Sequence, residues 1–218
     1  MKEQIYNLIT KYGIKAVQKC FPEYFARQPL QPTDRYVEYN FVSRFLPPLP
    51  ATILDVGCSG SFYPLILAGL GYKVQGIDIR PYNFKAENFE FMIMDISKSR
   101  LTPFDCITCI STLEHIGIGG RYGAKDDLTA DQRAVDNIMS MTNKAIFTVP
   151  FGKSKVIRPY TRIYDTKDLL GLFGKYINTK EWVALMEFYR HEDWTPMEPV
   201  ERNNDAYTSD LCCMVVTK

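Results

Sequence analysis

The segment ILDVGCSGSFYPLILAGLGYKVQGIDI, residues 53–79, constrains the fold more than any other part of the sequence. A short apolar run ends in an acid and a turn rich in glycine and serine. A helical stretch follows, and a second apolar run again ends in an acid. This order predicts a parallel β-α-β unit, because strands buried on both faces are nearly continuous apolar runs. The turn exposes backbone N–H groups beside a helix start, which suits a nucleotide or a carboxylate.

The alternation of strands and helices continues to the end of the chain. We predict strands at 52–58, 73–79, 89–95, 104–111, 144–150, 181–190 and 211–218, and helices at 62–70, 130–142 and 165–174. Asp165 and Thr129 are the predicted N-caps of two of these helices. The pattern predicts a Rossmann-like α/β fold with a seven-stranded, mostly parallel sheet. Residues 191–210 suit a hairpin connection, which would make the last strand antiparallel.

The first fifty residues differ from the rest of the chain. Apolar residues recur at helical spacing over 2–21 and 33–46, and the PPLP segment at 47–50 ends the second helix. We therefore predict a helical N-terminal cap over 1–50 and a main domain over 51–218. Ligands of such sheets bind at the carboxyl ends of the strands, so the loops there are the candidate functional segments.

Charge and hydropathy exclude several classes of partner. The 218 residues include 26 basic and 25 acidic side chains, and a net charge of +1 gives no overall attraction to nucleic acid or an anionic membrane. We find no run of ~20 apolar residues and no signal-peptide pattern, so we expect a cytoplasmic protein without a membrane span.

Five of the six cysteines sit in apolar runs, as expected for core residues in a reducing compartment. Cys106 and Cys109 form a CxxC motif, but strand alternation would point them to opposite faces, which favours core packing over zinc.

The turn after Asp55 is compatible with three ligands. Asp78 ends the next strand 23 residues later, where an acid typically accepts hydrogen bonds from both ribose hydroxyls. A P-loop requires a GxxxxGK[ST] pattern that this turn lacks, and a dinucleotide fingerprint needs a glycine where Phe62 stands. The third ligand is S-adenosylmethionine (SAM), whose nucleoside needs an acid for the ribose and which has no pyrophosphate that demands three glycines.

Several motifs together resemble class I SAM-dependent methyltransferases, in order over about residues 35–218. LDVGCSGS resembles their first motif, VQGIDI the ribose-binding motif, FMIMDI the adenine-binding acid, and FDCITCISTLEHIG a fourth motif with Ser-x-x-Glu-His. The segments EHIGIGGRYG and RIYD are similar to a bacterial methyltransferase-like family with Glu-His-x-Gly-x-Gly-Arg-Tyr-Gly and Arg-Ile-Tyr segments. Ser59 and Ser61 depart from the motif glycines, and Gly119-Gly120 lengthens the Glu-His segment.

The resemblance implies SAM as the cofactor and assigns residues to it. Asp78 would hold the ribose, Asp95 and the Ile96 amide would bind the adenine, and Ser111 would lie beside the sulfonium. The full set of implied cofactor contacts is Asp55, Gly57, Ser59, Asp78, Ile79, Asp95, Ile96 and Ser111.

Methyl transfer to a hydroxyl group requires removal of a proton. His115 is the candidate base and Glu114 could orient it, because histidine titrates near neutral pH. The alternative is a structural histidine that shapes the pocket. The loop after the fifth predicted strand is locally basic, so we expect a small polar, anionic acceptor, with a sugar or nucleotide-sugar first, methylated at oxygen or nitrogen. Its candidate contacts are Arg121, Tyr122, Arg162, Tyr164 and His191.

Three other functions stay open at this point. An RNA methyltransferase would show a wider basic face and usually an RNA-binding module. A non-catalytic protein of the same fold could serve as a partner subunit, since a fold does not guarantee activity. An NAD-dependent oxidoreductase is the third. We expect no metal site and interpret Asp126, Asp127 and Asp131 as a solvated loop and helix start, and a homo-oligomer is left open.

Overall fold

The computed structural model describes residues 33–120, 122–123, 125–177 and 179–218. Contacts divide the chain into two units, Met1–Thr33 and Asp34–Lys218, and the second holds every helix and strand of the described residues. The helix predicted at 2–21 and the candidate residue Arg121 lie outside the described residues. The predicted domain boundary at residue 50 stays a prediction.

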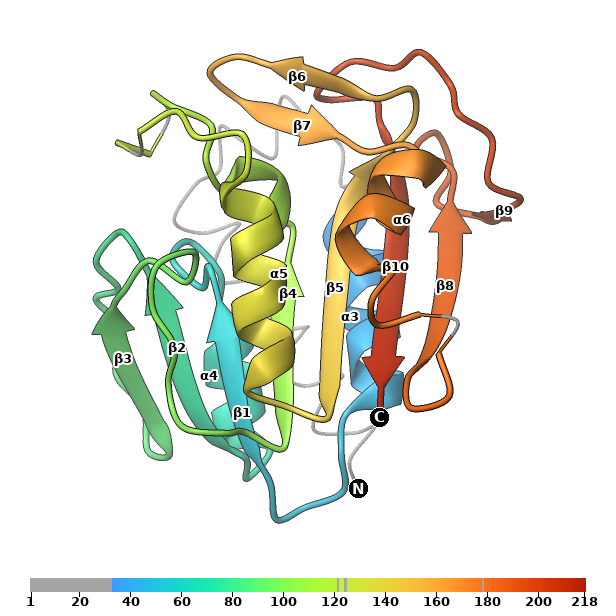
Figure 1. The fold of residues 1–218 in the computed structure, drawn as a ribbon. Coiled ribbons are helices and arrows are strands. Elements are labelled where there is room, and N and C mark those ends of the chain that lie inside the picture. Colours follow the sequence, from blue (N-terminus) through green and yellow to red (C-terminus); the bar gives the residue numbers. More distant parts are fainter. Residues whose placement is uncertain (1–32, 121, 124, 178) are drawn as a thin grey trace, which may run out of the picture. The chain divides into compact units, whose positions relative to one another are not determined.

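An eight-stranded sheet forms the centre of the second unit (Figure 1). The strands lie in the order β3-β2-β1-β4-β5-β10-β8-β9. The first five in this order are parallel, and β10 is antiparallel to both of its neighbours, as predicted for the last strand. Their bounds are β1 Thr52–Val56, β2 Lys73–Asp78, β3 Phe89–Ile93, β4 Cys106–Ile110, β5 Lys144–Phe151, β8 Val183–Tyr189, β9 Pro196–Met197 and β10 Asp210–Thr217.

The sheet has one strand more than the seven predicted. The additional strand, β9, is two residues long and pairs with β8. A separate hairpin of β6 (Lys155–Ile157) and β7 (Thr161–Ile163) was also missed. Two or three residues are too few to produce a recognisable alternation of apolar and polar side chains, so these strands leave no pattern in the sequence.

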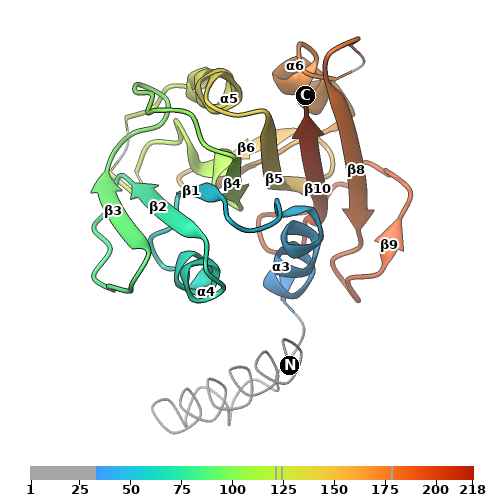
Figure 2. The same ribbon diagram turned by 90° about the horizontal axis from the view of Figure 1, so that it is seen from below.

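Helices cover both faces of the sheet (Figure 2). On one face lie α5 (Ala130–Ser140) and α6 (Thr166–Phe173), and on the other lie α3 (Asp34–Phe45) and α4 (Tyr63–Gly69). Each face buries an apolar cluster, which explains the nearly continuous apolar strands. No helix of the described residues is long and apolar enough to cross a membrane.

The CxxC cysteines belong to the core, as predicted. Cys106 packs in the cluster beneath α3 and α4, whereas Cys109 packs in the cluster beneath α5 and α6. Both are buried free thiols. Burial raises the pKa of Cys106 to about 12, so its thiol stays protonated at neutral pH.

The two predicted helix caps have different outcomes. Asp165 caps α6, because its carboxylate accepts from the Asp168 amide at 2.8 Å and the Asp168 carboxylate accepts in return from the Asp165 amide. The expected cap at Thr129 was wrong, since its side chain makes no capping bond to α5. The Thr129 hydroxyl donates instead to the Asp127 carboxylate at 2.9 Å.

Candidate functional site

The turn after β1 makes a close approach to the chain that follows β4. Gly57 has a φ of 78°, and a Cβ atom placed on it would lie 2.2 Å from Thr112 Oγ1. Glycine is required here because any side chain would overlap Thr112. The Gly57 amide donates to the Ile77 carbonyl at 2.8 Å, which fixes the turn to β2. The ends of β1, β2 and β4 therefore meet at this turn.

The two serines at motif glycine positions bind neighbouring segments. Ser59 Oγ donates to the carbonyl oxygens of Arg80 and Pro81, at 3.1 and 3.2 Å. Ser61 Oγ lies 3.0 Å from Tyr39 Oη of α3. The departure from glycine thus has a structural reason, because these hydroxyls attach the loop after β2 and the helix α3 to the turn.

Asp78 ends β2 with its carboxylate directed at the same turn. One oxygen accepts from the Ser59 amide and the other from the Arg80 amide, both at 2.9 Å. The Arg80 side chain reaches the same group, with Nε and Nη2 each 3.3 Å from a carboxylate oxygen. Its guanidinium also lies 4.3 Å from the centre of the Tyr122 ring. The acid expected to bind ribose is at the predicted place, with an arginine side chain across it.

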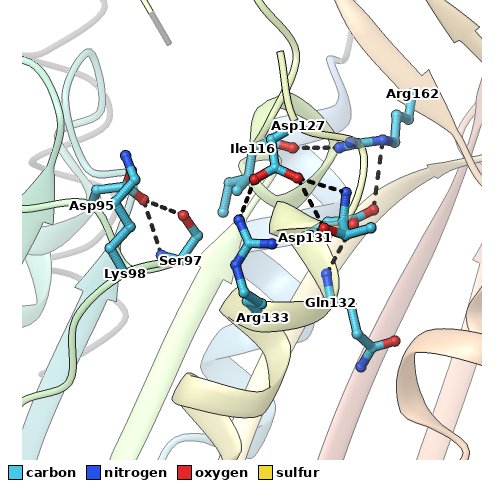
Figure 3. A network of polar contacts seen from close by, with 10 residues as sticks. Asp95, Ser97, Lys98, Ile116, Asp127, Asp131, Gln132, Arg133 and Arg162 are labelled. Atoms are coloured by element: carbon cyan, nitrogen blue, oxygen red, sulfur yellow. Dashed lines mark hydrogen bonds and ion pairs between the residues drawn. The ribbon is translucent and has the colours of Figure 1, made fainter. Parts of the chain in front are cut away.

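The residues expected to bind adenine, Asp95 and Ile96, follow the end of β3. Asp95 Oδ1 accepts from the Ser97 hydroxyl and Oδ2 from Lys98 Nζ, both at 2.6 Å (Figure 3). Partial burial acts to raise the pKa of Asp95, but the bonds from Lys98 and Ser97 outweigh it and lower the pKa. Ile96 is buried, whereas Ile79 is exposed beside the end of β2.

Asp55 is a buried acid at the end of β1. Its carboxylate accepts from Thr108 Oγ1 of β4 at 2.7 Å. Burial raises the pKa of Asp55 to about 7, so the group lies close to its protonation midpoint at neutral pH. A cation near this carboxyl group would favour its ionised form.

Glu38 of α3 is part of the site, and the sequence prediction missed it. It is fully buried, and its Oε1 accepts from Ser111 Oγ at 2.5 Å and from Thr148 Oγ1 at 2.6 Å. Burial raises the pKa of Glu38. Ser111 has a φ of 40°, a left-handed conformation that is uncommon outside glycine and is held here by these bonds. Glu38 occupies a position in the apolar stripe of α3 with Val42, a signal that could have identified it.

Glu114 and His115 follow Thr112 in a short 3-10 helix, η1 (Leu113–His115). His115 Nδ1 lies 2.7 Å from the Tyr160 carbonyl oxygen. Because a carbonyl oxygen only accepts, Nδ1 holds the proton and the lone pair of the neutral ring is on Nε2. Nε2 lies 3.7 Å from Glu114 Oε1. The structure therefore brings the predicted base and its acid together.

The Glu114 carboxyl group is buried beside this histidine. Burial raises the pKa of Glu114 to about 8. Among the described residues, its Oε2 and Arg162 Nη2 are the buried side-chain atoms without a hydrogen-bond partner. An unsatisfied buried oxygen of this kind calls for a ligand or water partner.

Two of the predicted acceptor contacts, Arg162 and Tyr164, are buried. Arg162 donates to the Ile116 carbonyl, and its Nε lies 3.6 Å from Asp131 Oδ2 (Figure 3). Tyr164 Oη donates to the same Asp131 oxygen at 3.2 Å. These contacts organise the chain that follows η1, and a direct contact of either side chain with an acceptor stays a prediction.

The remaining predicted acceptor contacts are separated. The Tyr122 ring packs edge-on against His115, with 5.3 Å between the ring centres. His191 follows β8 and packs on Trp194, with 5.2 Å between the ring centres. The sheet order places β5 and β10 between β4, which precedes His115, and β8, which precedes His191.

The acidic segment near α5 is neutralised by arginines. Asp126 pairs with Arg158 at 2.8 Å, and Asp127 pairs with Arg133 (Figure 3). The expectation that Asp131 is solvated was wrong. Its side chain is buried against Arg162. Within the described residues, no group of three or more His, Cys, Asp or Glu side chains is placed to hold a metal ion.

The site fits SAM in three respects. Gly57 provides a turn that a side chain would fill. Asp78 presents a carboxylate at the end of β2, where a ribose would bind. The buried acids Glu38, Asp55 and Glu114 near the ends of β1, β4 and β5 suit a ligand that carries a sulfonium and an ammonium group.

Comparison with known sequences finds similarity to methyltransferases over part of the chain. Residues 54–136 match the family model of a methyltransferase domain. A ubiquinone biosynthesis O-methyltransferase of Xanthomonas axonopodis pv. citri is 30% identical over 92 residues, which cover 37% of this chain and 38% of that protein. The chain thus spans less than half the length of the curated relatives it matches.

Solved structures extend the likeness along the chain. A TehB-like SAM-dependent methyltransferase from Corynebacterium glutamicum has a TM-score of 0.53 at 15% identity, covering 96% of this chain and 100% of that chain. The N-terminal domain of EvdMO1, solved in the presence of S-adenosylhomocysteine (SAH) and D-fucose, has a TM-score of 0.51 at 14% identity, covering 84% and 81%. The likeness to these structures shows the fold of the chain, and residues 54–136 are similar in sequence to a methyltransferase domain.

Proposed function

We propose that this domain methylates an oxygen or nitrogen of a small polar acceptor, with His115 as the base. The observation that supports this most directly is the contact between Gly57 and Thr112, because it places η1 beside the cofactor turn. When bound, SAM supplies a methyl group that its sulfonium makes electrophilic. The chain must then orient the acceptor and take up its proton.

His115 is arranged to receive that proton. The Tyr160 carbonyl fixes Nδ1 as a donor, so the acceptor proton passes to Nε2. Glu114 Oε1 lies 3.7 Å from Nε2 and, when ionised, stabilises the imidazolium that forms. Because burial raises the pKa of Glu114 to about 8, this stabilisation grows as the pH rises through that value.

The acceptor class we favour is an anionic sugar or nucleotide-sugar. The hairpin β6–β7 lies at the carboxyl edge of the sheet (Figure 1), and Lys153 and Lys155 on it and beside it favour an anionic group. The structure of EvdMO1 in the presence of D-fucose supports testing sugars first. The similarity to ubiquinone biosynthesis O-methyltransferases makes a phenolic hydroxyl the second candidate.

The test measures SAH formation from SAM with glucose 6-phosphate, UDP-glucose, D-fucose and catechol as probes. His115→Asn keeps an amide N–H for the Tyr160 carbonyl and removes the basic Nε2. We expect kcat to fall by about 10²–10⁴-fold. The affinity for SAH should stay unchanged, because the variant leaves the turn and Asp78 intact.

Two results would count against the proposal. Wild-type activity in His115→Asn would show that His115 is not the base. Tight SAH binding without turnover of any probe would favour the non-catalytic alternative. Glu114→Gln separates the two roles of the pair, because it should keep turnover at neutral pH and lose the rise in kcat above about pH 8.

A further inference from the structure

Three buried side chains hold the short helix η1, which carries Glu114 and His115, at both of its ends. They are Asp131 of α5, Arg162 of β7 and Tyr164 directly after β7, and together they form the η1 clamp. We propose that the η1 clamp positions His115 for proton transfer, so that Arg162 and Tyr164 act through η1 and not by touching the acceptor. The inference rests on the proposed role of His115 as the base.

The clamp binds η1 through main-chain carbonyl oxygens. Tyr164 Oη donates to the Leu113 carbonyl, at the start of η1, at 3.3 Å. Arg162 Nη1 donates to the Ile116 carbonyl, directly after η1 (Figure 3). These two carbonyls enclose residues 114 and 115, so the clamp fixes the backbone on both sides of the acid and the base.

A single carboxylate oxygen joins the two side chains that bind η1. Asp131 Oδ2 lies 3.2 Å from Tyr164 Oη and 3.6 Å from Arg162 Nε. The one hydroxyl hydrogen of Tyr164 is therefore shared between this oxygen and the Leu113 carbonyl. The other Asp131 oxygen accepts from the Gln132 amide at 2.8 Å, in the first turn of α5, where the helix dipole favours a negative charge.

The main chain of Tyr164 connects the clamp to the central sheet. The Tyr164 amide donates to the Pro150 carbonyl at 3.1 Å, and the Gly152 amide donates to the Tyr164 carbonyl at 3.0 Å. Both partners lie at the end of β5. Arg162 and Tyr164 are two residues apart in an extended segment, so their side chains point to the same side. The start of α5 and the end of β5 therefore both hold η1.

The same segment also holds the ring of His115. Its Nδ1 lies 2.7 Å from the carbonyl oxygen of Tyr160, two residues before Arg162 in the hairpin β6–β7. The position of η1 relative to this carbonyl decides whether Nδ1 keeps its acceptor. Residues 160–164 therefore set both the backbone of η1 and the tautomer of its histidine, which leaves the lone pair on Nε2 to receive a proton.

Burial favours a positioning role over contact with an acceptor. Arg162, Tyr164 and Asp131 have exposed fractions of 5%, 2% and 6%. Arg162 Nη2 is buried as well and has no hydrogen-bond partner among the described residues. A dissolved acceptor reaches such groups only after the segment has moved. If an acceptor oxygen did bind Nη2, loss of Arg162 would raise the KM for the acceptor, whereas loss of a positioning residue lowers kcat.

Nuclear magnetic resonance of the histidines tests the clamp without any ligand. The sequence contains two histidines, His115 and His191, so the imidazole nitrogen spectrum holds two sets of signals, which His115→Asn assigns. We expect the neutral His115 ring of the wild type to carry its proton on Nδ1. Tyr164→Phe removes one hydroxyl group and should give a mixture of the two tautomers, because η1 then moves relative to the Tyr160 carbonyl.

Turnover of glucose 6-phosphate, UDP-glucose, D-fucose and catechol measures the functional part of the proposal. In Tyr164→Phe, kcat should fall by about 2- to 10-fold, the usual effect of one lost hydrogen bond. The KM for the acceptor and the affinity for SAH should stay within about twofold of wild type. The double variant Asp131→Asn/Arg162→Met removes both buried charges, so that neither is left unpaired, and should lower kcat by about 10²-fold.

Tyr176→Phe is the matched control, because Tyr176 Oη donates to Asp136 of the same helix, α5, at 3.1 Å. It should change neither the His115 signals nor kcat. A His115 tautomer that stays as in the wild type in Tyr164→Phe and in the double variant would overturn the clamp, and so would a rise in KM at unchanged kcat. A wild type that methylates no probe but shows the expected tautomer would overturn the proposed function instead, since the spectrum requires no turnover.

Discussion

Replacing Gly57 by alanine tests whether the cofactor turn and the end of β4 pack as closely as the structure shows. The new Cβ would lie 2.2 Å from both Oγ1 and Cγ2 of Thr112, whereas carbon atoms normally pack at about 3.5–4.0 Å. Overpacking of this kind costs about 1–3 kcal/mol. The φ of 78° adds about 1–2 kcal/mol for a residue with a side chain. We expect the free energy of unfolding to fall by about 2–5 kcal/mol.

Gly60 provides the control in the same turn. Its φ is 93°, and an added Cβ would meet nothing within 4 Å, so Gly60→Ala should cost only the backbone part. Urea unfolding of both variants measures the difference. Adding Thr112→Ala to Gly57→Ala removes both 2.2 Å contacts and should restore part of the lost stability. Equal costs at the two glycines, or no rescue by Thr112→Ala, would refute the packing that places η1 beside the turn.

Two further predictions concern the charged groups of the site. Burial raises the pKa of Asp55 to about 7 and of Glu114 to about 8, above their ordinary values of 3.8 and 4.5, so the folded protein binds more protons than the unfolded chain between these values. The Tm of the wild type should therefore fall as the pH rises from 5 to 8, and the Tm of Glu114→Gln should fall by less. Calorimetric scans that show no fall in the wild type would contradict this. Arg80→Ala removes the side chain that lies across the Asp78 carboxylate. SAH binding should become about 1.5- to 5-fold tighter, which is the range expected for an exposed ion pair. Weaker SAH binding in a calorimetric titration would show instead that Arg80 assists the ligand.

The parts of the fold that the sequence predicted are those with long apolar patterns. The seven long strands and α4, α5 and α6 appear at the predicted places, because strands buried on both faces produce continuous apolar runs. Asp78 could be placed at the end of β2 for the same reason. The strands β6, β7 and β9 could not be predicted, since a few residues bury too little surface to impose a pattern.

The parts of the site that the sequence did not predict depend on contacts between distant segments. Glu38 binds Ser111 and Thr148, which lie 73 and 110 residues away from it along the chain. Arg162 is a charged residue in a loop at the ligand edge, which suggests contact with a ligand. The sequence does not show that Asp131 provides a buried countercharge for it. Residue type indicates which chemistry a side chain can perform, whereas burial and partners decide whether it faces a ligand.

The measurement that tests the central claim most directly is a calorimetric titration of the wild type and Asp78→Ala with SAH, with NAD as the control ligand. We expect the wild type to bind SAH and not NAD. Loss of the carboxylate from the turn should weaken SAH binding by at least about tenfold. A correctly folded wild type that does not bind SAH, or that binds NAD in its place, would contradict the assignment of this site to SAM.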